Sequence, residues 1–196
     1  GVTDTILGER GIALSDIEAI APAVKAAHET IMSHRTTRKI LFYDLPRDRA
    51  MTTQVKNLAL SLKGKFRTIV HLGIGGSSLG PKAIFSALKD PLHNLSAEPR
   101  LFFMDNIDPE MMHSILDHIR VEETLFTVVS KSGGTAETAA QFMVVYDLLK
   151  RTLGPQYKDH IVLITDPTQG ILRKLANNEG IASLSIPPEV GGRFSV

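Results

Sequence analysis

The sequence predicts an α/β fold: a doubly wound parallel sheet of about five strands, preceded by an N-terminal helical segment. Two patterns support this prediction. From residue 67 onward, short runs rich in β-branched and aromatic residues alternate with segments whose apolar residues recur at helical spacing. The short runs are continuously apolar, which is typical of strands covered on both faces. Alternation at this interval implies right-handed βαβ units and therefore parallel strands.

The beginning of the chain is predicted to be helical. Ser15 and Glu18 form an S-x-x-E pattern, which is typical of a capping box, and an apolar series at helical spacing follows. Pro22 interrupts this series, so we expect it to kink or split the helix. Apolar stripes of this kind usually pack into a core, and we assign no function to them.

A second helix is expected from about residue 47 to residue 63, because its apolar residues share one face and Gly64 follows as a stop signal. The two helical stretches together give an N-terminal helical segment at 1–65. The remainder, 66–196, is predicted to be the sheet domain.

Five runs are expected to form the strands: TIVHLG (68–73), RLFFMD (100–105), TLFTVVS (124–130), HIVLIT (160–165) and IASLSI (181–186). A helix is expected from about residue 136 to residue 150. In open sheets of this class, ligands bind beyond the carboxyl ends of the strands. Two glycine-rich segments, 73–80 and 130–135, fall at that edge and form the candidate site.

Composition excludes several classes of protein. The net charge of +1 gives no electrostatic case for a nucleic-acid or membrane partner. The chain has no cysteine, so disulfides, thiolate catalysis and cysteine metal sites are excluded. It shows neither a signal peptide nor an apolar run long enough to span a bilayer, and we expect a cytoplasmic protein. His113 and His118 lack the i, i+4 spacing of a helical zinc pair, so no metal site is predicted.

The first glycine-rich segment, HLGIGGSSLGP at 71–81, fits neither common nucleotide-binding pattern. Gly73 and Gly75 match a dinucleotide fingerprint, but Ser78 occupies its third glycine position. Pro81 stands where a Walker A loop requires lysine. A tight strand-to-helix turn, with Pro81 in the first turn of the helix, explains this segment as well as a ligand does.

The second segment, SKSGGTAET at 130–138, is more informative. Three hydroxyl side chains, two glycines and a helix start follow one another there, and the residues concerned are Ser130, Ser132, Gly133, Gly134 and Thr135. Glycines allow backbone N–H groups to converge on an anion, and a helix start adds unpaired N–H groups and partial positive charge. A plain N-cap is the alternative, but a cap needs one hydroxyl only. We therefore predict a phosphate site, and since no aromatic platform for a base is evident, a sugar phosphate as its ligand.

A hydrolase is a weaker alternative. Ser86-x-x-Lys89 together with Lys131-Ser132-Gly133 resembles the acyl-transfer motifs of penicillin-binding proteins. The S-D-N element of that pattern is missing, and Ser86 lies within an apolar helical stripe.

Three motifs in this order resemble the glucose-6-phosphate isomerase (phosphoglucose isomerase) family: GIGGSSLGP at 73–81, SKSGGTAET at 130–138 and GGRFSV at 191–196. Asn106-Ile107-Asp108 is also similar to that family. The first two motifs would suit any sugar isomerase (SIS) domain, and the third is specific to this family. The resemblance implies a flavodoxin-like SIS domain and an aldose–ketose isomerase of glycolysis and gluconeogenesis. Such an enzyme interconverts glucose 6-phosphate and fructose 6-phosphate through an enediolate, without metal or organic cofactor.

The resemblance also implies roles for single residues. The phosphate site would consist of Ser130, Lys131, Ser132 and Thr135, shaped by Gly133 and Gly134. Sugar hydroxyls would meet Gly76 and Ser77. Arg193 would face the developing enediolate with Gly192 keeping the backbone close, and Glu137 would orient the ring-opening histidine. Without the resemblance, Glu137 is a first-turn glutamate favoured by the helix dipole, and Arg193 a surface arginine near a chain end.

In the family, the base glutamate, the ring-opening histidine and a lysine lie beyond the GGR motif, in a second SIS domain. We therefore expect these 196 residues to be the N-terminal domain of the enzyme, able to bind a sugar phosphate but inactive alone. The resemblance implies a homodimer for the full-length enzyme. The competing hypothesis is a non-catalytic SIS module that binds a sugar phosphate and regulates a partner.

Overall fold

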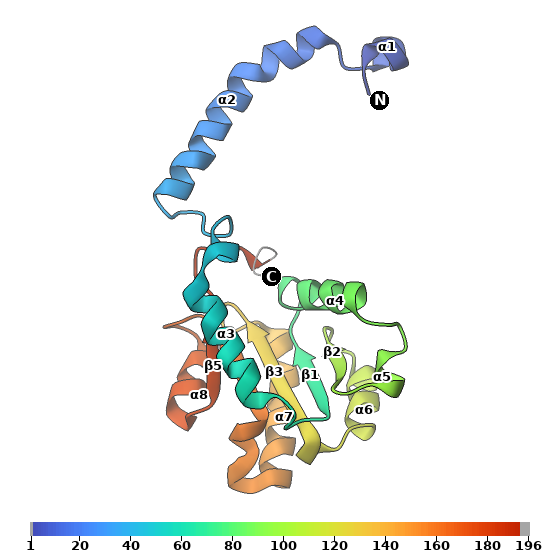
Figure 1. Cartoon of the computed structure of the whole chain (residues 1–196), viewed down its shortest axis with the longest axis vertical. Helices are drawn as coiled ribbons and strands as arrows, with labels where there is room; N and C mark the ends of the chain where they lie inside the picture. Colours follow the sequence, from blue (N-terminus) through green and yellow to red (C-terminus); the bar gives the residue numbers. More distant parts are fainter. Residues whose placement is uncertain (1, 193–196) are drawn as a thin grey trace. The chain divides into compact units, whose positions relative to one another are not determined.

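The structure is a computed structural model, and it describes residues 2–192 (Figure 1). The chain divides into two compact units, Gly1–Tyr43 and Asp44–Val196. The helical segment expected at 1–65 spans both units, because the helix α3 (Arg49–Leu62) belongs to the same unit as the sheet.

The first unit contains α1 (Asp4–Leu7), a 3₁₀ turn and the long helix α2 (Leu14–Thr36). The expected capping box at Ser15 is wrong, because the helix starts earlier and the Ala13 N–H donates to Asp16 Oδ2 at 2.9 Å. Of the kink or split expected at Pro22, the split is also wrong, since α2 continues through it. Proline removes a single helical hydrogen bond, and the turns on both sides hold the helix together.

The second unit is built on a five-stranded parallel sheet in the order β2-β1-β3-β4-β5, which confirms the predicted fold class. The strands lie within one residue of the predicted runs: β1 (Thr68–Leu72), β2 (Arg100–Met104), β3 (Thr124–Ser130), β4 (Ile161–Thr165) and β5 (Ala182–Ser185). In this order the chain winds outward in one direction from β1 to β2 and in the other from β1 through β3, so the switch point lies between β1 and β3.

Helices cover both faces of the sheet (Figure 1). Besides α3 they are α4 (Gly76–Leu88), α5 (His93–Ser96), α6 (Pro109–Asp117), α7 (Ala136–Leu153) and α8 (Ile171–Glu179). Val70, Phe126 and Leu163 are fully buried in one core cluster with Val145 and Leu149 of α7. A mostly apolar cavity of about 900 Å³ lies between α3 and the sheet face opposite α7. Among the residues described, no helix combines the length and hydrophobicity needed to cross a membrane.

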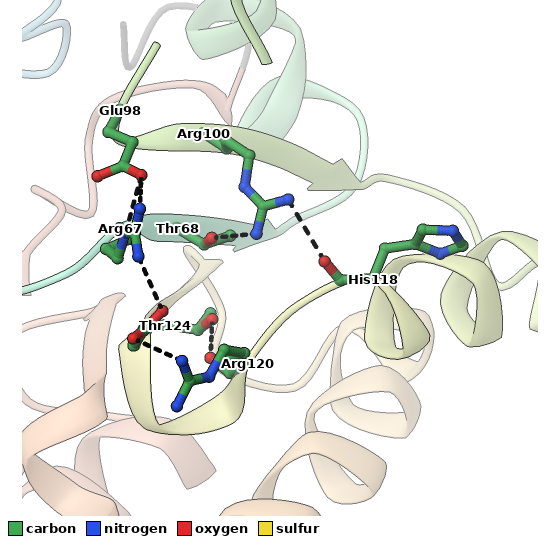
Figure 2. Close-up of polar contacts among 8 residues, drawn as sticks. Arg67, Thr68, Glu98, Arg100, His118, Arg120 and Thr124 are labelled. Atoms are coloured by element: carbon green, nitrogen blue, oxygen red, sulfur yellow. Dashed lines mark hydrogen bonds and ion pairs between the residues drawn. The ribbon is translucent and has the colours of Figure 1, made fainter. Parts of the chain in front are cut away.

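The amino end of the sheet is closed by its own polar side chains (Figure 2). Arg67 donates to Glu98 through Nε at 2.8 Å and Nη2 at 2.6 Å, and this pairing lowers the pKa of Glu98. Arg100 at the start of β2 donates to Thr68 Oγ1 on β1 at 3.0 Å. Thr124 Oγ1 at the start of β3 donates to the Arg120 carbonyl at 2.7 Å. The polar groups at this end therefore serve the fold, and the loops at the opposite edge are the candidate site.

Candidate functional site

The two glycine-rich segments lie on either side of the topological switch point. One follows β1 and leads into α4, and the other follows β3 and leads into α7. Because β1 and β3 are neighbouring parallel strands, their carboxyl ends meet at the same edge of the sheet. The position of the candidate site is therefore the one at which this fold class binds ligands.

The segment after β3, here called the phosphate loop (Ser130–Thr135), is held by its own side chains. Ser130 is buried, and its Oγ is hydrogen-bonded to Thr135 Oγ1 at 3.0 Å. The Gly133 N–H donates to the Ser130 carbonyl at 3.1 Å, and the Gly134 N–H donates to Ser132 Oγ at 3.3 Å. The N–H groups of both glycines are thus used within the loop. These two groups are therefore not available to an anion, and the converging N–H groups expected from the sequence would have to come from other residues of the segment.

Unpaired donors lie at the start of α7. The Thr135 side chain does not cap this helix, because its hydroxyl faces Ser130. Within the described part of the chain, the N–H groups of Ala136, Glu137 and Thr138 have no hydrogen-bond partner. These are the orphan donors of a helix N-terminus, where the helix dipole adds partial positive charge. The start of α7 is therefore suited to an anion.

The phosphate loop rests on the end of β4 and the turn that follows it. The Asp166 N–H donates to the Lys131 carbonyl at 3.1 Å. A Cβ on Gly133 would lie 3.1 Å from Thr165 Oγ1, and a Cβ on Gly170 would lie 2.5 Å from the Ser132 carbonyl oxygen. Both glycines also have positive φ, 67° at Gly133 and 90° at Gly170. The loop can keep this shape only because Gly133 and Gly170 have no side chains at the point where their backbones approach each other.

The predicted ligands in this loop differ in exposure. Ser132 and Glu137 are exposed, Lys131 and Thr135 are half-buried, and Ser130 is 3% exposed. Ser132, Lys131 and Thr135 are thus accessible to solvent, whereas the Ser130 hydroxyl is buried against Thr135.

The segment after β1 contains no long loop. Gly75, with φ 57°, is the N-cap of α4, so Gly76 and Ser77 form the first turn of that helix. The expectation that Pro81 lies in the first turn is therefore wrong, and Pro81 lies inside the helix. The reason is that Gly75 lets the chain turn from strand to helix directly. The Ser77 N–H donates to the Ile74 carbonyl at 3.1 Å.

His71, which no sequence pattern singled out, lies on β1 beneath this turn. It is 7% exposed, and both ring nitrogens are hydrogen-bonded: Nε2 to the Ser77 carbonyl at 2.7 Å and Nδ1 to Thr127 Oγ1 at 3.0 Å. Burial lowers the pKa of His71, so the ring is neutral at pH 7. A histidine within a mostly apolar strand, directly before a glycine-rich turn, was the available signal.

The last predicted motif follows β5. The Ile186 N–H donates to the Thr165 carbonyl at 2.8 Å, and Val190 is fully buried, so this segment is tied to the carboxyl edge of the sheet. Gly192 belongs to it, whereas Arg193 lies outside the described residues. Across residues 2–192 no three His, Asp or Glu side chains are grouped so as to hold a metal ion.

Comparison with known proteins finds, over most of the chain, the family that the three sequence motifs resemble. The family model described as phosphoglucose isomerase matches residues 48–196. The chain is 40% identical to glucose-6-phosphate isomerase of Rubrobacter xylanophilus over 96% of its length, and 38% identical to that of Carboxydothermus hydrogenoformans over 92%. It spans 44% and 40% of the length of these two relatives.

A solved structure is also similar. The crystal structure of a hypothetical protein from Thermus thermophilus aligns with a TM-score of 0.81 and 35% identity. The alignment covers 92% of this chain and 42% of that one. The match thus extends beyond the sheet domain into the N-terminal helical region.

Proposed function

Because the chain belongs to the phosphoglucose isomerase family, we propose that it forms the sugar-phosphate-binding part of an enzyme that interconverts glucose 6-phosphate and fructose 6-phosphate. The observation that carries this proposal is the start of α7, where unpaired N–H groups follow a loop rich in hydroxyls at the switch point of the sheet. In this proposal the phosphate group of the sugar binds there.

Phosphate binding at this position needs little formal charge. The N–H groups at the start of α7, the hydroxyls of Ser132 and Thr135, and Lys131 would supply the donors. A hydrogen bond to a charged group contributes about 1.5–3 kcal/mol, so a few of them hold a phosphate monoester. The Lys131 ammonium adds one positive charge beside the dipole of α7.

The remainder of the sugar would extend toward the start of α4, where Gly76 and Ser77 meet its hydroxyls. The isomerase reaction opens the ring and moves a proton between C1 and C2 through an enediolate, which is acid–base chemistry. Arg193 would stabilise the negative charge that develops only in the transition state, with Gly192 keeping the backbone close. Glu137 would orient the histidine that opens the ring, and no metal or organic cofactor takes part.

Proton abstraction requires a base within about 3 Å of the substrate carbon. The family resemblance assigns that base and the ring-opening histidine to a second SIS domain, and the relatives are more than twice as long as the matched region. We therefore expect these 196 residues to bind fructose 6-phosphate without isomerising it. We also propose, from the same resemblance, that the full-length enzyme is a cytoplasmic homodimer.

The test is the double substitution Ser132→Ala with Thr135→Ala. Loss of two donors should weaken fructose 6-phosphate binding at least about tenfold, as measured by isothermal titration calorimetry. Thr53→Ala with Ser61→Ala on α3 is the matched control, because both hydroxyls bond to carbonyls of their own helix. Unchanged affinity in the double variant would exclude the phosphate loop as the binding site.

A non-catalytic sugar-phosphate module remains the competing hypothesis. Identities of 38% and 40% to proteins named glucose-6-phosphate isomerase favour the enzyme. The two hypotheses separate in a coupled isomerase assay on a longer protein that contains this sequence followed by a second SIS domain. Turnover supports the enzyme, and binding without turnover supports the module.

A further inference from the structure

One carbonyl at the start of α4 cannot receive its ordinary helical hydrogen bond. In an α-helix, the carbonyl of residue i accepts from the N–H of residue i+4. For Ser77 that residue is Pro81, which lies inside α4 and has no N–H. The first turn of α4, which carries the proposed sugar contacts, therefore has a carbonyl that needs another donor.

His71 supplies that donor from the sheet. Its Nε2 lies 2.7 Å from the Ser77 carbonyl oxygen, and because a carbonyl only accepts, Nε2 carries the proton. Nδ1 of the neutral ring then accepts from Thr127 Oγ1 at 3.0 Å. Thr127 is the residue opposite His71 in the pairing of β1 with β3, so the imidazole joins both strands of the switch point to the start of α4.

The space around this contact is filled. A Cβ on Gly73 would lie 3.0 Å from Ser77 Cβ and from the Ser77 carbonyl oxygen, and 3.3 Å from His71 Nε2. The Phe103 ring packs against the imidazole, with the centroids 5.5 Å apart. His71 can therefore reach Ser77 only because residue 73 has no side chain. The Ser77 side chain itself is half-buried and makes no hydrogen bond to another described residue.

We propose that His71 is a positioning residue that replaces the N–H missing at Pro81, fixes Ser77, and thereby sets the affinity for the sugar end of the ligand. This inference rests on the proposed function, in which Ser77 meets a sugar hydroxyl. It adds that Pro81 and His71 form a coupled pair. The phosphate loop makes none of these contacts, so binding of phosphate alone does not depend on His71.

The experiment compares two probes, fructose 6-phosphate and inorganic phosphate, by calorimetry on the 196-residue chain. His71→Leu should weaken fructose 6-phosphate binding about fivefold, since one hydrogen bond is lost, and leave the phosphate affinity unchanged. His71→Gln, whose amide can still donate, should retain most of the affinity. In a Pro81→Ala background the helix regains its own N–H, so the additional effect of His71→Leu should be less than about twofold.

An equal loss with and without the Pro81→Ala substitution, or an equal loss for both probes, would overturn the inference. Failure of the wild-type chain to bind either probe would instead contradict the proposed function. A measurement without substitution covers the case in which the variants do not fold. In ¹⁵N NMR spectra at neutral pH, His71 should be the Nε2–H tautomer, and an Nδ1–H tautomer would overturn the inference.

Discussion

The two glycine-rich segments join a parallel strand to a helix at the same edge of the sheet, yet their hydrogen bonds differ. After β1 the chain enters α4 within a few residues, and a buried histidine holds the carbonyl of its first turn. After β3 the hydroxyls bond to each other across the loop, and the first N–H groups of α7 are left without partners among the described residues. The segment after β1 is therefore held in place (the platform), whereas the segment after β3 presents unpaired N–H groups and is the anion site that we propose (the open site). Composition alone does not distinguish them, whereas the partners of their hydroxyl and N–H groups do.

The largest effect on stability and binding is expected at Gly170, in the turn before α8 that contacts the phosphate loop. Gly170→Ala places a Cβ 2.5 Å from the Ser132 carbonyl oxygen at a φ of 90°, so the phosphate loop must move. The unfolding free energy should fall by about 1–3 kcal/mol, and binding of inorganic phosphate should no longer be measurable by calorimetry.

Gly180→Ala is the matched control. Its φ is also positive, at 69°, but a Cβ there meets nothing within 4 Å. This variant should show the cost of backbone strain alone and bind phosphate normally. Retained phosphate affinity in Gly170→Ala would show that the loop geometry does not decide anion binding.

Much of this arrangement could be predicted from the sequence. The strands were placed within a residue because each is a continuous β-rich run between turn signals, and the phosphate loop stood out by its hydroxyls and glycines. The identity of the donors could not be predicted, because it depends on whether Thr135 caps its helix or bonds to Ser130. The role of His71 was hidden for a similar reason, since its partners lie on β3 and α4.

His71 in the platform should make the stability of the chain depend on pH. Burial lowers the pKa of His71 in the folded state, while the nearby Asp105, itself paired with Lys82, opposes this shift. In the unfolded chain the pKa is about 6.5. Below that pH the unfolded state takes up a proton that the folded state resists, so the unfolding free energy falls as the pH decreases.

Urea unfolding at pH 7.5 and pH 5.5 measures this effect. The wild-type chain should lose more stability than His71→Leu over this interval, because the other histidines are common to both proteins. Thr127, Ser77 and Phe103 also contact the ring, and none of them titrates in this range. Equal losses in the two proteins would mean that His71 takes up its proton as readily in the folded state as in the unfolded state.

The smallest effect on the unfolding free energy, and one of opposite sign, is expected at Thr165, next to Gly133 of the phosphate loop. Thr165 is fully buried, and its Oγ1 has no hydrogen-bond partner within the described part of the chain. Thr165→Val removes a hydroxyl whose desolvation is uncompensated, so the unfolding free energy should stay the same or rise by about 1 kcal/mol. Thr124→Val is the control, because Thr124 is equally buried but donates to the Arg120 carbonyl at 2.7 Å, and its loss should cost about 1–2 kcal/mol. Phosphate affinity should be unchanged in both variants. Weaker phosphate binding in Thr165→Val would mean that this hydroxyl takes part in the anion site, which would then extend from α7 down to the end of β4.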